Sequence, residues 1–199
     1  MKRIVEALED GEREGVYPGA VLLIACRGEI VFLEALGHRS VVPMKQPMKK
    51  DTVFDLASLT KPLATTLVMM KLVDQGIIDL DRPLSELLPF ADLRDKRELS
   101  PRLLLSHSAG LADWKPFFMK LVQFPPEIRR AILREQIIGL PFAYRPGTSC
   151  IYSDLGFMIL EWIIHERTGE RLPSYLARQF YGPCLLYTSD AADEEDSVD

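Results

Sequence analysis

The sequence predicts an α/β chain of the α+β kind, in which an N-terminal helix and an antiparallel hairpin are followed by a region of helices. Two apolar, β-branched runs at residues 20–26 and 30–35 are joined by the short polar connection 27–29, as in a hairpin. Farther along, prolines stand where the first turn of a helix would be, and residues 155–168 carry apolar side chains at helical spacing. Strands and helices therefore occupy separate parts of the chain.

The remaining elements follow from periodicity and from start and stop residues, taken in chain order. Residues 1–14 form a charged amphipathic helix that ends at Gly15, and residues 38–50, which have little periodicity, form a loop. Asp154 is expected to cap the helix at residues 155–168, and we assign the apolar stripe of that helix to the core. Further helices are expected over four segments with a serine, proline or acid at or before the first turn: residues 63–74, 101–105, 126–137 and 155–168.

The composition is that of an ordinary globular chain, with 199 residues, 47% hydrophobic content, 27% charged content and a net charge of −5. Basic residues are scattered among acids, so the sequence predicts no nucleic-acid partner. Apolar runs are much shorter than a spanning helix and no signal sequence is recognised, so we expect a cytoplasmic protein without a membrane partner. The oligomeric state stays open.

Neither a metal nor a cofactor is expected. The cysteines, Cys26, Cys150 and Cys184, are odd in number and widely separated, which argues against a disulfide framework and against a zinc site. His38 and His165 lack the spacing of metal ligands. The chemistry is therefore expected to come from side chains alone.

That chemistry is expected around the segment Ser58-Leu59-Thr60-Lys61-Pro62. Because proline is tolerated only in the first turn, a helix through residues 63–74 has to begin near Ser58. Ser58 then lies at a helix N-terminus, where free N–H groups favour an oxyanion, and Lys61 shares its face and could remove its proton. The alternative is a helix cap followed by a surface lysine.

A second group, Tyr152-Ser153-Asp154, comes just before the helix at residues 155–168. A phenol beside a lysine can shuttle protons between a serine and a leaving group, and a short polar residue can hold the lysine or a substrate amide. The alternative is a half-buried tyrosine followed by an ordinary helix cap. The serine motif upstream favours the catalytic interpretation.

Several segments, in one order and with compatible gaps, resemble the serine β-lactamase and penicillin-binding-protein superfamily, in its branch of class C β-lactamases, D-alanyl-D-alanine carboxypeptidases and esterases. The resemblance implies a partial serine β-lactamase-like fold, with the N-terminal helix, the hairpin of the sheet and most of the helical region, and without the later strands. It covers residues 1–183 and rests on these motifs: Phe54-Asp55-Leu56-Ala57-Ser58-Leu59-Thr60-Lys61-Pro62, Leu72-Val73-Asp74-Gln75-Gly76, Leu80-Asp81-Arg82-Pro83, Leu103-Leu104-Leu105-Ser106-His107-Ser108-Ala109-Gly110-Leu111, Pro146-Gly147-Thr148 and Tyr152-Ser153-Asp154.

The resemblance also implies roles for individual residues. Ser58 would be the acylated nucleophile, Lys61 the group that activates it, and Tyr152 the general base or proton shuttle. Asp154 would bind substrate at the position where the family usually has asparagine, and its extra charge makes an ester or peptide substrate more expected than a β-lactam. His107 would be structural, because its segment is a turn that packs the helical region in this family.

The expected function is that of a serine hydrolase that forms an acyl-enzyme on an ester, amide or β-lactam carbonyl. Its partner would be a small-molecule ester, peptide or β-lactam substrate. The alternative is a non-catalytic binding or regulatory protein that keeps the fold.

We expect residues 1–183 to form a partial hydrolase domain and residues 184–199 to be a non-native, disordered tail. The tail does not continue the family's pattern and resembles a translated sequencing adaptor, although a natural acidic tail is the alternative. The chain is then a truncated gene fragment that would be inactive alone, whereas the full-length protein would be an enzyme.

Overall fold

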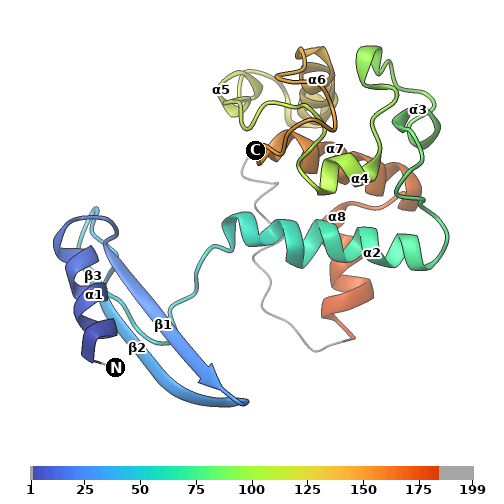
Figure 1. Ribbon diagram of the computed structural model, residues 1–199. Helices are drawn as coiled ribbons and strands as arrows, with labels where there is room; N and C mark the ends of the chain where they lie inside the picture. The colour runs from blue at the N-terminus through green and yellow to red at the C-terminus, as the bar shows by residue number, and fades with distance from the viewer. Residues whose placement is uncertain (1, 184–199) are drawn as a thin grey trace. The chain divides into compact units, whose positions relative to one another are not determined.

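The computed structural model describes residues 2–183, and the chain divides into two compact units between Phe54 and Asp55 (Figure 1). The first unit holds the strands and one helix, and the second unit holds the remaining helices. The expectation for residues 184–199 lies outside the described residues. Among the helices of residues 2–183, none is both long and apolar enough to cross a membrane.

The first unit is a helix followed by a small antiparallel sheet. It contains α1 (Lys2–Arg13), β1 (Gly19–Cys26), β2 (Glu29–Ser40) and β3 (Gln46–Pro47), with the strands in the order β1-β2-β3. The predicted hairpin is confirmed, and its connection has Arg27 at a φ of +53° and Gly28 at +85°. Two successive positive φ values give the kind of turn whose twist matches that of the flanking strands.

One expectation for this unit is wrong, because residues 38–50 are not entirely a loop. β2 continues to Ser40, and the two-residue strand β3 pairs with it so that His38 lies opposite Pro47 and Ser40 opposite Gln46. A strand of two residues has no alternation of apolar and polar side chains, so periodicity could not reveal it. Within residues 2–54 no side chain is classed as buried, so the core described here belongs to the second unit.

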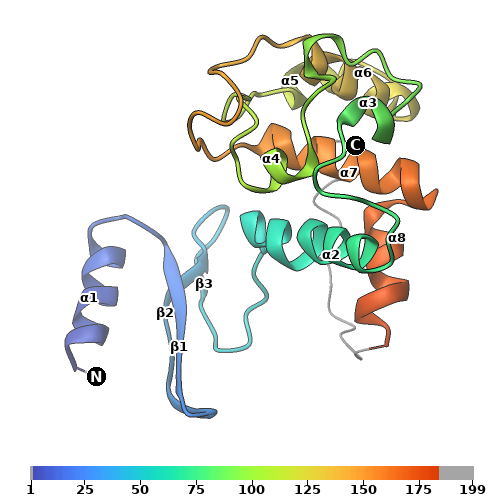
Figure 2. The ribbon, with the colours of Figure 1, turned by 45° about the vertical axis from the view of Figure 1, so that its right-hand side comes forward.

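The second unit is a group of helices arranged around α7. Figures 1 and 2 show α7 running between α2 on one side and α4 and α6 on the other, and α7 also contacts α3 and α8. The elements, in order, are the 3-10 turn η1 (Ala57–Leu59), the π-helical segment η2 (Lys61–Thr66), α2 (Leu67–Asp74), α3 (Leu84–Leu87), the 3-10 turn η3 (Arg94–Lys96), α4 (Pro101–Leu105), α5 (Phe118–Leu121), α6 (Pro126–Gly139), α7 (Asp154–Thr168), α8 (Leu172–Leu176) and the π-helical segment η4 (Ala177–Tyr181).

The core of this unit is aliphatic and is built on α7, which confirms the assignment of its apolar stripe. Leu155, Leu160 and Ile163 of α7 are fully buried, as are Leu72 of α2 and Leu104 of α4. Burying an aliphatic side chain contributes about 1.5 to 3 kcal/mol, so these contacts fix where α7 begins relative to α2 and α4. The N-terminal end of α7 thereby becomes a rigid support for the residues just before it.

The predicted helix starts are confirmed at Pro101 and Pro126, and Gly169 ends α7 at a φ of +71°. The cap of α7, however, is Ser153 and not Asp154. The Ser153 hydroxyl accepts a hydrogen bond from the Gly156 N–H, whereas Asp154 is already the first helical residue. The expectation that Asp154 caps this helix is therefore wrong, because serine is an equally good cap and the Asp154 carboxylate binds Lys61 instead.

Candidate active site

Ser58 lies on a sharp turn of the backbone. The residue before it, Ala57, has a φ of +44°, a left-handed conformation that costs a residue with a Cβ about 1 to 2 kcal/mol. The turn is held by the Ala57 N–H, which donates to Asp55 Oδ1 at 2.6 Å, and by the Leu59 N–H, which donates to the Leu56 carbonyl. Strain of this kind concentrates at functional sites, and Ser58 itself is exposed at the tip of the turn.

Lys61 opens η2 and meets residues from the start of α7. Its Nζ atom donates a hydrogen bond to Asp154 Oδ1 at 2.6 Å, although 93 residues separate the two in sequence. The same ammonium lies 4.8 Å from the centre of the Tyr152 ring and 5.6 Å from that of Phe157. The Lys61 side chain is only 15% exposed, so these partners replace most of its water.

The pKa of Lys61 reflects these neighbours. Burial lowers it, but hydrogen bonds with Asp154 and Tyr152 and the negative charge of Asp154 raise it further, so the net direction is upward. Lys61 is therefore charged at neutral pH, in contrast to the neutral base that the sequence suggested. Among the contacts of residues 2–183 there is also no hydrogen bond between Ser58 and Lys61, whose ammonium is bonded to Asp154.

Tyr152 and Asp154 are placed by a segment that runs alongside them. Residues 106–113 follow residues 143–154 through backbone hydrogen bonds of 2.8 to 3.0 Å, among them the Gly147 N–H to the Ser108 carbonyl and the Asp154 N–H to the Asp113 carbonyl. The buried Ser153 hydroxyl adds a bond of 2.6 Å to the Ala112 carbonyl. These contacts set the backbone on both sides of Tyr152.

His107 contributes its ring to the same arrangement. Its Nδ1 atom accepts a hydrogen bond of 3.0 Å from the Ser153 N–H, and its ring centre lies 4.6 Å from that of Tyr152. Burial and then the charge of Lys61 lower the pKa of His107. The residue therefore supports the site as a neutral ring, and sequence reasoning missed its contact with Tyr152 because the two are far apart in the chain.

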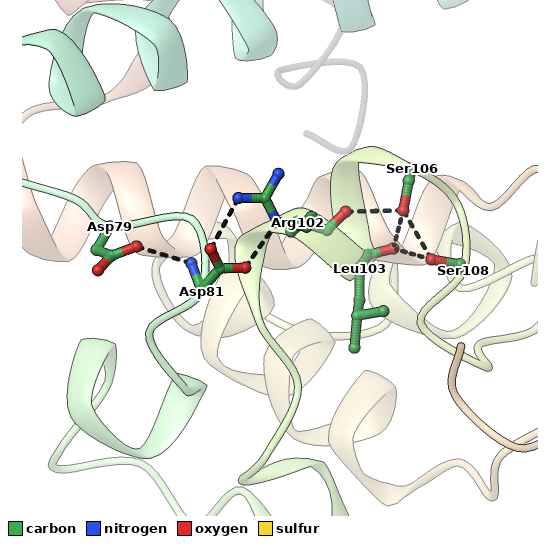
Figure 3. Close-up of polar contacts among 6 residues, drawn as sticks. All are labelled: Asp79, Asp81, Arg102, Leu103, Ser106 and Ser108. Atoms are coloured by element: carbon green, nitrogen blue, oxygen red, sulfur yellow. Dashed lines mark hydrogen bonds and ion pairs between the residues drawn. The ribbon is translucent and has the colours of Figure 1, made fainter.

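The turn that carries His107 is tied to α4 by a chain of polar contacts (Figure 3). Arg102 donates to both carboxylate oxygens of Asp81, at 2.6 and 2.8 Å, and the Asp81 N–H donates to Asp79 Oδ1. The hydrogen bonds from Arg102 lower the pKa of Asp81. On the other side of Arg102, its carbonyl accepts from the Ser106 hydroxyl, which also pairs with Ser108 at 2.7 Å.

Of the four residues predicted for the site, the structure brings three into contact. Lys61, Tyr152 and Asp154 form one cluster. Ser58 lies in η1, which leads directly into η2 and Lys61. Phe157, which lies against both Lys61 and His107, was assigned only to a core helix. Within residues 2–183 there is no group of three or more His, Cys, Asp or Glu side chains that could hold a metal ion.

Comparisons with known proteins identify the family of the chain. The family model described as Beta-lactamase matches residues 2–196. An N-acetylmuramyl-L-alanine amidase of Bacillus subtilis (strain 168) is 31% identical over 198 residues, which is 92% of this chain and 45% of that protein. A protein of Escherichia coli (strain K12) named "Putative D-alanyl-D-alanine carboxypeptidase" is 33% identical over 190 residues, which is 85% of this chain and 42% of that protein.

A solved structure is similar to this chain in its fold. The D-amino acid amidase from Ochrobactrum anthropi SV3, in complex with L-phenylalanine, has a TM-score of 0.69 and 25% identity, covering 92% of this chain and 49% of the amidase. The chain thus spans less than half the length of these relatives. The helical fold, the order of the motifs and the match over residues 2–196 together show that the chain belongs to the beta-lactamase family, within the serine β-lactamase and penicillin-binding-protein superfamily.

Proposed function

We propose that the protein is a serine hydrolase that cleaves an amide or ester carbonyl through an acyl-enzyme. The observation that carries this proposal is the cluster at the start of α7. There the Lys61 ammonium is bound to Asp154 at 2.6 Å and lies against the Tyr152 ring, three residues after the exposed Ser58. The Ser58 hydroxyl can serve as the nucleophile. The Tyr152 phenol, beside the Lys61 cation, can transfer protons to and from it.

In the proposed mechanism, Ser58 Oγ attacks the carbonyl carbon of the substrate and loses its proton. Tyr152, which lies against charged Lys61, passes its own phenolic proton to the leaving group as it takes up the proton of Ser58, so that the bond to the leaving group breaks, an ester on Ser58 remains and the phenol is restored. Water then attacks this ester and restores the hydroxyl. Asp154 supports these steps by keeping the Lys61 ammonium in place and charged.

For the substrate, the relatives and the charge of the site favour amides and esters over β-lactams. The relatives compared above are named as amidases and as a carboxypeptidase. In this chain the Asp154 carboxylate already neutralises Lys61, so a substrate carboxylate finds no unpaired cation at this point. We therefore expect Asp154→Asn to shift selectivity toward β-lactams, and unchanged selectivity would contradict this assignment of substrate.

Turnover of a panel of esters, D-amino acid amides and β-lactams tests the proposal, using the protein expressed from its complete gene. Ser58→Ala should abolish turnover with the fold intact, and Tyr152→Phe should slow it by ~10²- to 10⁴-fold. Ser174→Ala, which changes an exposed serine of α8, is the matched control and should retain full activity. Activity that survives Ser58→Ala would refute the assignment of the nucleophile.

A further inference from the structure

His107 contacts Tyr152 and the residues on both sides of it. Its ring accepts from the Ser153 N–H and lies against Tyr152 and Phe157, while its carbonyl accepts from the Ile151 N–H at 3.0 Å. The residues on either side of Tyr152 are thus both bonded to His107. No other residue of the range 2–183 is bonded to both neighbours of Tyr152 and also lies against its ring.

The position of His107 is itself fixed. Its backbone has a φ of +55°, and its carbonyl accepts a second hydrogen bond, of 2.9 Å, from the Tyr144 hydroxyl. The two flanking serines, Ser106 and Ser108, are bonded to each other and to carbonyls of α4 (Figure 3). Because the ring is held in place, a change in its protonation state would alter its contacts with Ser153 and Tyr152.

The hydrogen bond to Ser153 defines that protonation state. A ring nitrogen that accepts from a backbone N–H carries no proton, so Nδ1 is bare and the neutral ring holds its proton on Nε2. An imidazolium would place one N–H group against another and would add a positive charge beside Lys61. Burial and the charge of Lys61 lower the pKa of His107, and a protonated Nδ1 could no longer accept the hydrogen bond from the Ser153 N–H.

The charged and titratable groups around the ring come from three elements. Lys61 on η2 opposes its protonation and Asp154 on α7 favours it, while Tyr152 is the ring in contact. Tyr144 and Cys150 face the backbone of the turn, since the Tyr144 hydroxyl donates to the His107 carbonyl and the Cys150 thiol donates to that of Ser106. None of these groups replaces Nδ1 as the acceptor for Ser153.

We propose that neutral His107 is a positioning residue for the acyl-transfer site, and that protonation of its ring frees Ser153 and the Tyr152 ring and so switches the site off in acid. The proposal rests on the proposed function for its catalytic consequence. His107 does not exchange protons with the substrate. It acts through Tyr152, whose placement against Lys61 depends on the contacts described above.

The test uses two variants of His107 that remove different parts of its side chain. In His107→Asn the amide Oδ1 stands near the place of Nδ1 and can accept from Ser153, but it does not titrate. In His107→Phe the ring stays and the acceptor is lost. The readout is the rate at which a fluorophosphonate labels Ser58 across roughly pH 4.5 to 9, in the protein expressed from its complete gene.

We expect the wild-type rate to fall by roughly tenfold per pH unit in acid. His107→Asn should keep the rate at high pH within ~3-fold and lose this acid dependence, whereas His107→Phe should be ~3- to 10-fold slower at every pH because the Ser153 N–H has no acceptor. His165→Asn, a matched change at a histidine bonded to the Glu170 carbonyl at the end of α7, should keep the wild-type profile. An acid dependence that persists unchanged in His107→Asn would overturn the proposal.

A second measurement separates this inference from the proposed function. If the wild type is not labelled at any pH, the proposed function fails, and nuclear magnetic resonance then decides the role of His107. The amide signal of Ser153 and the ring signals of Tyr152 should move with the titration of the His107 ring, and should not do so in His107→Asn. If the Ser153 and Tyr152 signals do not change as the His107 ring titrates, the positioning role of His107 is contradicted.

Discussion

At the scale of single residues, the pairing of Lys61 with Asp154 decides the chemistry of the site. A lysine beside a serine can serve as a neutral base only if its surroundings lower its pKa, and burial alone would do so here. The carboxylate at 2.6 Å reverses that direction. Lys61 is consequently a cation held in place by Asp154, and in the proposed mechanism Tyr152 is the group that moves the proton.

This arrangement predicts how Asp154→Asn changes the titration of Lys61. Without the negative charge and the charged hydrogen bond, burial outweighs the remaining contact with Tyr152, so the pKa of Lys61 should fall and its neutral amine should appear at lower pH. The pH dependence of Lys61 acylation by an amine reagent measures this. Asp113→Asn, at an exposed carboxylate that binds the Trp114 N–H, should leave the profile where it is. Equal profiles for the wild type and Asp154→Asn would show that the ion pair does not set the pKa.

The sequence predicted the residues of the candidate site but not how they pair. Ser58, Lys61, Tyr152 and Asp154 were found through short motifs, each of which has a local signature. The contact of Asp154 with Lys61 joins residues 93 positions apart and depends on how α7 packs, which no local pattern encodes. The structure has this contact and not the expected one between Ser58 and Lys61, and a hydrogen bond between two charged groups is the stronger kind.

At the scale of elements, the loop before α7 and the segment at residues 106–113 act together. The Ser153 hydroxyl donates to the Ala112 carbonyl and caps α7, so one buried side chain fastens both segments. We predict that Ser153→Ala lowers the free energy of unfolding by about 1 to 3 kcal/mol, measured by urea denaturation.

The matched control is Ser100→Ala at the start of α4. Ser100 occupies the same cap position, but its side chain makes no cap hydrogen bond in the described structure. Its replacement should cost less than about 0.5 kcal/mol. Similar losses for the two variants would mean that the contacts of Ser153 do not stabilise this end of α7.

Two glycines in these segments provide another comparison. Gly110 and Gly147 have nearly the same φ, +77° and +79°, but a Cβ on Gly110 would lie 2.5 Å from the Tyr144 carbonyl oxygen, whereas one on Gly147 would meet nothing within 4 Å. Gly147→Ala should therefore cost about 1 to 2 kcal/mol from backbone strain alone. Gly110→Ala should cost about 1 to 3 kcal/mol more, because the two segments have to separate. Thermal denaturation of both variants measures this, and equal losses would contradict the close packing.

Element boundaries were predictable where a residue type dictates them. Pro101 and Pro126 start α4 and α6 because proline fits only the first helical turn, and Gly169 ends α7 because glycine tolerates a positive φ. The division of residues 57–74 into a 3-10 turn, a π-helical segment and α2 was not predictable. It depends on which carbonyl each N–H reaches, and all three choices suit the same sequence.

At the scale of the whole molecule, stability and the site share a dependence on pH through His107. A histidine whose pKa is lowered by folding contributes stability above its unfolded pKa, about 6.5, and that contribution is lost as the pH falls toward the folded value. We predict that the wild type loses more stability than His107→Asn between about pH 7.5 and pH 5. Urea denaturation at the two pH values measures this, and equal losses would place the acid sensitivity elsewhere.

The central claim is that Ser58 forms a covalent acyl-enzyme, and one mass-spectrometric measurement tests it most directly. The protein expressed from its complete gene is treated with a fluorophosphonate or with penicillin, digested, and searched for the added mass. We predict one equivalent of adduct on the peptide that contains Ser58, and none in Ser58→Ala. An adduct on another residue, or none with any acyl donor in a folded wild type, would contradict the account and favour a binding protein that has kept the fold.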